Sequence, residues 1–501
     1  MLAAVAWLGM QSASAHAADA IVRPNQLRQR ITGFGASSAW TAPDLGDADA
    51  DLLFTTDSGV GLSLLRVRIP PGGCSPPDET CEVATALKAR ARGATVWASP
   101  WSPPAAWKSN GDVNHGGTLL PEHADDWAGS LVAFVSWMQG QGVSISYVSA
   151  QNEPTTVVDY ESCIYSPGAL TDFIGNHLGP AFGAANLSTK ILAPETQDWG
   201  QFPAFANSIL GNESASSAVG IIATHSYGNA MPAAYPQAME LWQTEVFDQS
   251  TPADPGIGSA IRVALMMNSA LVDASVNAWH YWWIRPRGND NGALWDMATG
   301  SPSKRLYAMG NFSRFVRPGF RRVATTTTGP TPGIAFSAYS DPPSGQLVIV
   351  AINENSAPVS QAFLFDGVAV GSWMSWVTSS SEIPLSSGSP VAAGANPSEL
   401  VFSLEAQSVT TLQGLVTGVG PALPASFQTT SAPQEGEATG CACSVVGAGR
   451  DGNAVGAATT AIFGTACLGR RRRRRRRGPL VLKPHPVPPL RERACGEGAG
   501  E

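Results

Sequence analysis

Short apolar runs recur along residues 31–283 at intervals typical of alternating strands and helices. Several runs are apolar almost throughout, as parallel strands buried on both faces should be. Between them lie helical patterns such as residues 125–142, where apolar residues recur every three or four positions and a glycine ends the run. The eight runs are ITGFGASSAW (31–40), LSLLRVRI (62–69), TVWASP (95–100), ISYVSAQNEP (145–154), KILAPE (190–195), IIATHSYG (221–228), LWQTEVF (241–247) and VNAWHYWW (276–283).

Eight strands alternating with helices over about 250 residues predict an α/β protein with a (β/α)8 TIM barrel. Beyond Pro318 the pattern changes to alternation with period two and frequent turns, which indicates antiparallel strands. We therefore expect the barrel over residues 19–303 and a C-terminal side β-sandwich over residues 304–415. Residues 21–31, before the first barrel strand, are candidates for a further strand of that sandwich.

The two ends of the chain differ in composition from the part between them. Residues 1–18 combine an apolar core with a small-residue cleavage zone, which is typical of a secretory signal peptide. Residues 416–440 are rich in Pro, Ser, Thr, Gln and Glu and predict a linker with little that could pack. The N-terminal segment favours an exported protein.

Residues 441–501 begin after a linker and combine a Cys motif, an apolar stretch and eight consecutive arginines at 470–477. Together these resemble the C-terminal sorting tail of myxobacterial surface proteins. The apolar stretch at 454–469 is shorter than the ~20 residues that span a bilayer, and a low-complexity tail without an address is the alternative. The resemblance implies a secreted or cell-surface anchored protein that meets a membrane only through this tail.

Composition narrows the choice of partner. Residues 441–501 contain 12 Lys+Arg and 4 Asp+Glu, which leaves 19 basic and 35 acidic residues in the rest of the chain. An acidic body argues against nucleic acid as a partner and leaves a neutral or sparsely charged polymer. The seven cysteines show no metal-site spacing. Cys74 and Cys81 bracket a Pro-rich loop and form either a small disulfide or two free thiols.

Two carboxylates occur where barrel strands are expected to end. Glu153 follows the fourth strand and Glu245 ends the seventh, 92 residues later, which corresponds to three βα units of about 31 residues each. Active sites of such barrels lie at the carboxyl ends of the strands. Two carboxylates amid polar and aromatic residues at these ends describe a retaining glycosidase, in which they lie about 5–5.5 Å apart.

Five segments together resemble glycoside hydrolase family 30 over residues ~21–415. The features DYESC and LLPEH lean toward its bacterial xylanase branch. The resemblance implies a barrel with a side β-sandwich and an endo-β-1,4-xylanase that hydrolyses the xylan backbone with retention and uses neither metal nor cofactor. We also expect a monomer. The segments are SPWSPPAAWKSNGDVNHGGTLLPEH, YVSAQNEPTTVVDYESCIYSPGALTDFI, ELWQTEVF, AWHYWWIR and RLYAMGNFSRFVRPGFRRV.

The resemblance implies that Glu153 is the acid/base and Glu245 the nucleophile. Asn152 is placed to bind the sugar 2-OH, and Arg66 to keep Glu245 ionised, with a structural salt bridge as its alternative. His225 and Tyr227 are expected to orient Glu245 or to bind the sugar; a core histidine is the alternative. Further aromatic candidates for stacking on sugars, each equally a candidate for the core, are Trp101, Trp242, Trp282 and Trp283.

One segment departs from the pattern of the glucuronoxylan-specific members of the family. These show adjacent arginines and a following Tyr, whereas this chain has Arg285, Pro286, Arg287 and Gly288. Arg285 and Arg287 remain candidates for binding a glucuronate side group. The departure predicts a preference for decorated xylan rather than a requirement for it. Alternative functions are hydrolysis of another β-glycan (a β-1,6-glucan, a galactan or a β-glucoside) and non-catalytic carbohydrate binding at the cell surface.

Overall fold

The computed structural model describes residues 15–16, 18–40, 45–74, 81–228, 239–383, 388–392 and 394–423. The expected signal peptide up to residue 14, residues 424–440 of the expected linker and the whole arginine-rich tail lie outside the described residues. Cys74 and Cys81 form a disulfide, and Cys163 is a buried free thiol.

Eight parallel strands close into a barrel in which the last strand pairs with the first. Each strand falls on one of the eight apolar runs of the sequence, so the predicted barrel is confirmed. The strands are β3 (Gly33–Ser37), β4 (Leu64–Ile69), β5 (Thr95–Pro100), β6 (Ile145–Ser149), β7 (Lys190–Thr196), β8 (Val219–His225), β9 (Glu240–Glu245) and β10 (Ala278–Trp283).

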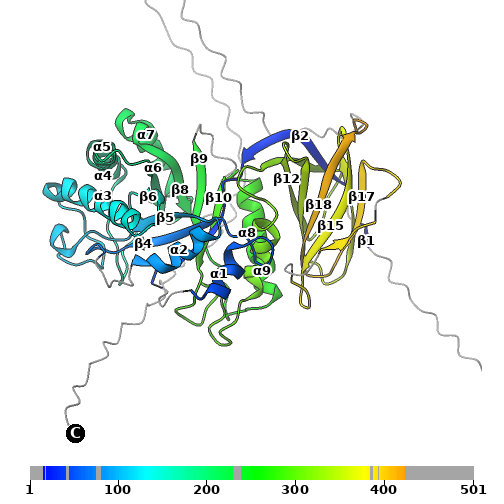
Figure 1. The fold of residues 1–501 in the computed structure, drawn as a ribbon, viewed down its shortest axis with the longest axis horizontal. Helices are drawn as coiled ribbons and strands as arrows, with labels where there is room; N and C mark the ends of the chain where they lie inside the picture. The colour runs from blue at the N-terminus through cyan, green and yellow to red at the C-terminus, as the bar shows by residue number, and fades with distance from the viewer. Residues whose placement is uncertain are drawn as a thin grey trace, which may run out of the picture. The chain divides into compact units, whose positions relative to one another are not determined.

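Helices surround the ring of strands on its outer side (Figure 1). The last of them, α9, occupies the first residues of the range that the sequence pattern gave to the sandwich, since it follows β10 and packs beside α8. Within the described residues, no helix has the length and apolarity to cross a bilayer. The helices are α1 (Asp47–Phe54), α2 (Val83–Ala91), α3 (Ala124–Gly140), α4 (Pro167–Asp172), α5 (Gly179–Ala184), α6 (Phe202–Leu210), α7 (Glu213–Ala218), α8 (Ile257–Val272) and α9 (Lys304–Ser313).

A second, mainly antiparallel sheet contains the remaining strands. The long strand β2 precedes the barrel in the chain yet lies among these strands (Figure 1), antiparallel to β11 and parallel to β14. The strands of this second sheet are β1 (Ala15–His16), β2 (Ala20–Arg30), β11 (Arg321–Thr327), β12 (Ile334–Asp341), β13 (Gln346–Asn353), β14 (Val359–Phe365), β15 (Val368–Thr378), β16 (Ser389–Pro390), β17 (Glu399–Leu404) and β18 (Ser408–Val419).

Helix α9 is joined to the strands of the second sheet by hydrogen bonds. The Asn311 side chain donates to Thr411 Oγ1 at 3.0 Å and accepts from Thr378 Oγ1 at 2.6 Å, and all three groups are fully buried. Buried polar groups that are satisfied in this way fix one relative register. The sandwich therefore contacts the barrel through specific polar bonds as well as apolar packing.

Large aromatic rings fill the lower interior of the barrel. Trp242 is fully buried there, with its ring centroid 4.7 Å from that of Tyr147 and 6.2 Å from that of Trp97. It lies three residues before Glu245 on β9, too deep to meet a substrate, so Trp242 belongs to the core rather than to the sugar-stacking residues. Gly35 makes room for this filling, because a Cβ there would lie 2.6 Å from the His280 ring.

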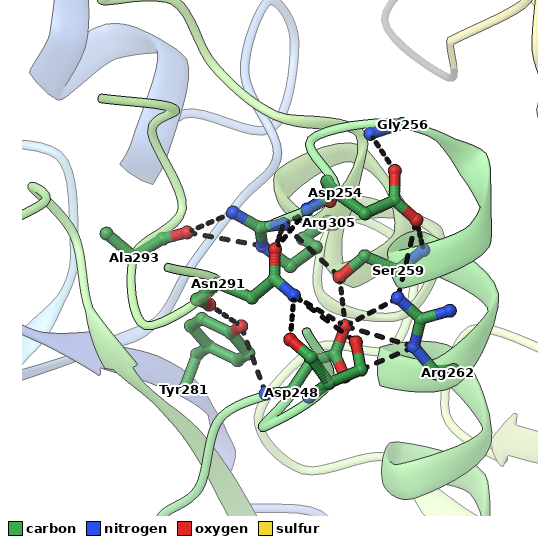
Figure 2. A network of polar contacts seen from close by, with 10 residues as sticks. Asp248, Asp254, Gly256, Ser259, Arg262, Tyr281, Asn291, Ala293 and Arg305 are labelled. Carbon is green, nitrogen blue, oxygen red and sulfur yellow. Dashed lines mark hydrogen bonds and ion pairs between the residues drawn. The ribbon is translucent and has the colours of Figure 1, made fainter. Parts of the chain in front are cut away.

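A buried polar network fixes the loops that follow β9 and β10 (Figure 2). Arg305, in the first turn of α9, is 1% exposed and donates to the backbone oxygens of Ala293 and Asp254 and to Asn291 Oδ1. Asp248 accepts from Arg262 and Asn291. Because these groups come from two loops and two helices, the network holds the mouth of the barrel beside the end of β9.

We expect Arg305→Met to destabilise the protein by at least about 1–3 kcal/mol, because buried acceptors would lose their only charged donor. The change would appear in the denaturant midpoint of unfolding at constant slope. Arg90→Met on the exposed face of α2 is the matched control and should shift the midpoint little. Equal midpoints for the two variants would contradict the structural role given to Arg305.

Candidate active site

Glu153 and Glu245 meet at the carboxyl ends of the barrel strands. Glu245 is the last residue of β9, and Glu153 lies four residues after the end of β6. One side-chain oxygen of each and one ring nitrogen of His225 lie within 4.8 Å of one another. Both carboxylates are buried, at 6% exposure each. The barrel therefore brings together the two carboxylates that the sequence pattern singled out.

The segment that carries Glu153 is held by backbone hydrogen bonds to both neighbouring strands. The Asn152 N–H donates to Pro100 O at the end of β5, and the Glu153 N–H donates to Glu195 O near the end of β7, each at 2.9 Å. Glu153 has φ +43°, in the left-handed region. That conformation costs on the order of 1–3 kcal/mol and persists because its surroundings fix it.

Arg66 is the central cation of the site. It lies within β4, fully buried, and its guanidinium bonds both to Glu245 and, through Nη2, to Asn152 Oδ1 at 2.6 Å. The second contact orients the Asn152 amide, whose Nδ2 has no hydrogen-bond partner among the described residues and is left as a donor. Arg66 therefore forms the salt bridge and also positions the expected 2-OH ligand.

A third buried carboxylate, Glu195, was not singled out from the sequence. Its Oε1 forms an ion pair with Arg66 Nη2 at 2.7 Å, and its Oε2 accepts from Ser99 Oγ at 2.7 Å. Arg66 and His225 hold the pKa of Glu195 at about 2 in spite of its complete burial. The available signal was its position, since it ends the apolar run KILAPE, and Glu245 stands likewise at the carboxyl end of its own strand.

Tyr227 contacts Glu245, one of the two roles expected of it, whereas His225 forms its hydrogen bonds with Glu153 and Glu195 rather than with Glu245. His225 Nδ1 lies 2.9 Å from Glu153 Oε1, and the Tyr227 hydroxyl donates to Glu245 Oε1 at 2.9 Å. Burial disfavours a charged imidazole, but the surrounding carboxylates outweigh it and raise the pKa of His225 to about 9. His225 is thus a buried cation that contacts carboxylates through both ring nitrogens, with Nε2 3.3 Å from Glu195.

The mouth of the barrel holds three carboxylates and two cations. Arg66 and His225 balance two of the negative charges of Glu153, Glu195 and Glu245, and burial penalises the third. Burial and the charge of Glu153 accordingly raise the pKa of Glu245, while His225 and Arg66 act in the opposite direction.

Glu153, His225 and Glu245 also have the spacing of three ligands to one metal ion. Both nitrogens of His225 already face carboxylates, and a metal ligand must be a neutral imidazole. Arg66, which pairs with Glu245, would add repulsion. The donor set therefore suits proton chemistry better than a divalent cation.

Aromatic rings form a wall beside the carboxylates. Trp101 lies 4.5 Å from the Arg66 guanidinium, and the Trp282 ring centroid is 6.0 Å from that of Trp101. Trp40 and Tyr160, which the sequence pattern missed, join this cluster at 4.7 Å and 6.3 Å between ring centroids. Trp40, Tyr160 and Trp282 are half-buried, so their faces are the ones left for a ligand.

Two of the expected aromatic residues lie behind this wall. Trp101 is 2% exposed and acts mainly as packing against Arg66. Trp283 is buried and stacks on Trp282 with centroids 4.6 Å apart, so it supports the ring that faces the site.

Arg285 and Arg287 differ in what they contact. Arg285 forms an ion pair with Asp49 of α1 and lies over the Trp295 ring at 4.4 Å, so it is engaged in structure and its assignment to the substrate is not supported by its contacts. Arg287 is half-buried and has no hydrogen-bond or ion-pair partner in the described part of the chain. Burial and the nearby charge of Arg68 lower the pKa of Arg287.

Comparisons with known proteins agree with this geometry. The sequence profile of the Glycosyl hydrolase family 30 TIM-barrel domain matches residues 81–253. The glucuronoxylanase XynC of Bacillus subtilis is 31% identical over 418 residues, covering 79% of this chain and 91% of the relative. The lysosomal acid glucosylceramidase of Mus musculus is 27% identical, covering 68% of this chain and 78% of that protein.

A solved structure extends the similarity to three dimensions. The family 30 subfamily 8 xylanase Xyn30A from Clostridium acetobutylicum is 32% identical, with a TM-score of 0.71 over 79% of this chain and 100% of that structure. The shared fold includes the barrel and the side sandwich. With its two carboxylates at the ends of β6 and β9, the chain belongs to glycosyl hydrolase family 30 and is a glycoside hydrolase.

Proposed function

We propose that the protein is an endo-β-1,4-xylanase that cleaves the xylan backbone with retention of configuration. The observation that carries the proposal is the separation of the two carboxylates, whose nearer oxygens lie within 4.8 Å. Retaining enzymes place their carboxyl groups about 5–5.5 Å apart, whereas inverting enzymes need about 6.5–9.5 Å to admit a water. The identity of 31–32% to proteins described as xylanases supports the choice of xylan.

Hydrogen bonding favours Glu245 as the nucleophile. It accepts from the Arg66 guanidinium and from the Tyr227 hydroxyl, and both contacts stabilise a carboxylate. Ionised Glu245 would attack the anomeric carbon and form a glycosyl-enzyme ester as the leaving oxygen departs. Tyr227 and Arg66 keep both carboxylate oxygens in place for that attack.

Glu153 would act as the acid and then as the base. His225 bonds to its Oε1, so Oε2 carries the proton that the departing glycosidic oxygen needs. After the first step Glu153 is ionised and takes a proton from the water that attacks the ester. Asn152 Nδ2, oriented by Arg66, would donate to the sugar 2-OH, a contact that strengthens in the transition state.

Arg287 is the residue best placed to bind a glucuronate side group. Its guanidinium has no hydrogen-bond or ion-pair partner in the part of the chain that the structure describes, and its neighbour Arg68 adds positive potential although Arg68 itself is paired with Glu161. An anionic substituent would therefore gain a charge-assisted bond at this point. Unsubstituted xylan would still bind through the aromatic wall, so we propose a preference for decorated xylan rather than a requirement.

The roles of the two glutamates can be separated by comparing substrates whose leaving groups differ in their need for protonation. Glu245→Ala should abolish glycosyl-enzyme formation with every substrate. Glu153→Ala should slow hydrolysis of xylan by about 10²–10⁴-fold but reduce much less the first step on activated aryl xylosides, which need no protonation. Steady-state and burst kinetics on both substrate types measure this, and identical responses of the two variants would reverse or reject the assignment.

The wild-type protein provides the test of the reaction itself. NMR of the first products from xylan should show the β anomer before mutarotation. A first product of α configuration would reject retention, and turnover of a β-1,6-glucan or a galactan without turnover of xylan would reassign the substrate. Xylan binding without turnover would favour the non-catalytic alternative.

Arg287→Ala should lower kcat/KM on glucuronoxylan by roughly 10- to 100-fold, because a charge-assisted hydrogen bond contributes about 1.5–3 kcal/mol. It should leave undecorated xylan nearly unaffected. Arg285→Ala is the matched control, since its guanidinium is bound to Asp49, and it should affect both substrates alike. A selective loss in Arg285→Ala instead would show that the assignment is interchanged.

We further propose that the protein is exported and anchored through residues 441–501. The Cys74–Cys81 disulfide supports an oxidising compartment. Deletion of residues 441–501 should leave xylanase activity intact and move the protein from the cell surface to the medium, measured by fractionation. An unchanged distribution would reject the sorting function of the tail.

A further inference from the structure

Glu195 contacts Arg66 and His225, the two side chains that also contact Glu245 and Glu153. It is fully buried near the end of β7, with Arg66 Nη2 at 2.7 Å, Ser99 Oγ at 2.7 Å and His225 Nε2 at 3.3 Å. These three partners come from β4, β5 and β8. Glu195 therefore crosslinks the floor of the site without reaching the place where a substrate would lie.

The backbone of Glu195 also supports the site. Its carbonyl accepts the N–H of Glu153 at 2.9 Å, and its own φ of +55° is in the left-handed region. A left-handed, non-glycine residue persists only where its surroundings determine it. Side chain and backbone together connect Glu195 to Arg66, His225 and Glu153.

Among the described residues, the charged groups around Glu195 come from several barrel strands. The cation Arg66 comes from β4 and the cation His225 from β8, while Glu153 follows β6 and Glu245 ends β9. Two further titratable groups lie near them. Tyr227, beyond β8, raises the pKa of Arg66 and is itself neutral, and burial lowers the pKa of His280 on β10 to about 3, so its ring is neutral.

We propose that Glu195 is a positioning residue: a permanent counter-anion that keeps His225 an imidazolium and divides Arg66 between two carboxylates. The cationic ring then donates through Nδ1 to Glu153 Oε1 and through Nε2 to Glu195, which fixes its orientation. Because Arg66 pairs with both Glu195 and Glu245, it holds Glu245 in place but does not neutralise the charge of Glu245 completely. The consequence for catalysis rests on the proposed roles of Glu153 and Glu245, whereas the control of His225 does not.

Glu195→Gln isolates the charge, because the amide has the same shape and keeps one acceptor oxygen. Glu240→Gln is the matched control: Glu240 lies at the opposite end of β9, where it accepts from Thr32 and Trp242. The first measurement is the pKa of the His225 ring by NMR of histidine-labelled protein without substrate, with His225→Asn to assign the signal.

Removal of the Glu195 charge should lower the pKa of His225. In the wild type, His225 should titrate at about 9, and in Glu195→Gln its pKa should fall by about 1–3, since an adjacent negative charge is lost. Glu240→Gln should leave it unchanged. An unchanged pKa in Glu195→Gln would overturn the proposal. So would a wild-type His225 that titrates near the ordinary ~6.5, a result that needs no variant to fold.

The second measurement is the pH profile of kcat/KM. In Glu195→Gln the acidic limb, where His225 is still protonated, should move to lower pH, because loss of the Glu195 charge stabilises ionised Glu245. The alkaline limb should also move to lower pH, because the His225 ring loses its proton earlier. KM should change little because Glu195 does not touch substrate, and Glu195→Asp should restore the limbs toward the wild type. A uniform loss of kcat with unmoved limbs would reduce Glu195 to a structural role.

The two measurements separate this proposal from the proposed function. A protein that fails to hydrolyse xylan but whose His225 titration depends on Glu195 would refute the substrate and retain the positioning role. A protein that hydrolyses xylan but whose His225 pKa is the same in the wild type and in Glu195→Gln would support the substrate and refute the positioning role.

Discussion

The buried charge balance at the mouth of the barrel is the constraint on which the rest of the structure depends. Three carboxylates and two cations share a space from which water is largely excluded. An unpaired charge in such a place is expensive, so each group must be held against its partner. The strands supply that precision, because Arg66, Glu195, His225 and Glu245 all sit on the barrel itself rather than on long loops.

The outer layers of the site serve the same constraint in different ways. Trp101 and Trp282 of the aromatic wall, together with Trp97 below them, cover Arg66 with rings that attract a cation and exclude water, which strengthens its bonds to the carboxylates. The network around Arg305 and Asp248 fixes the loops after β9 and β10 by satisfying buried backbone oxygens. One layer thus sets the electrostatics of the site and the other sets its shape.

Sequence pattern predicted the barrel because each strand is a short apolar run with clear ends. The same rule found Glu245, yet it did not single out Glu195, which ends KILAPE in the same way. A lone carboxylate at a strand end is more often a salt bridge, and its partners Arg66 and His225 become neighbours only when the barrel closes. The sequence also could not show how deep a side chain lies in the barrel. Trp242 and Trp282 are the same residue type on adjacent strands, yet Trp242 lies in the core and Trp282 faces the site.

Long-range pairing explains the remaining differences. Nothing near Arg285 in the sequence indicates that Asp49, 236 residues away, would bind it, while Arg287 has no ion-pair partner among the described residues. Helix α9 was placed in the sandwich because its range follows the last apolar strand run, whereas tertiary packing against α8 makes it the final helix of the barrel.

The position of β2 has a consequence for how the chain acquires its structure. Residues 20–30 are made first, but the strands that flank them are residues 321–327 and 359–365. A ribosome therefore completes the whole barrel before β2 can find either neighbour, and the loop that must close is about 300 residues long, which is slow on entropic grounds. Until then the exposed edges of β2 are open to wrong partners. The sandwich is accordingly no detachable C-terminal module. Loss of the C-terminal strands would leave β2 without a sheet to join, and loss of β2 would separate β14 from β11 and divide the sheet.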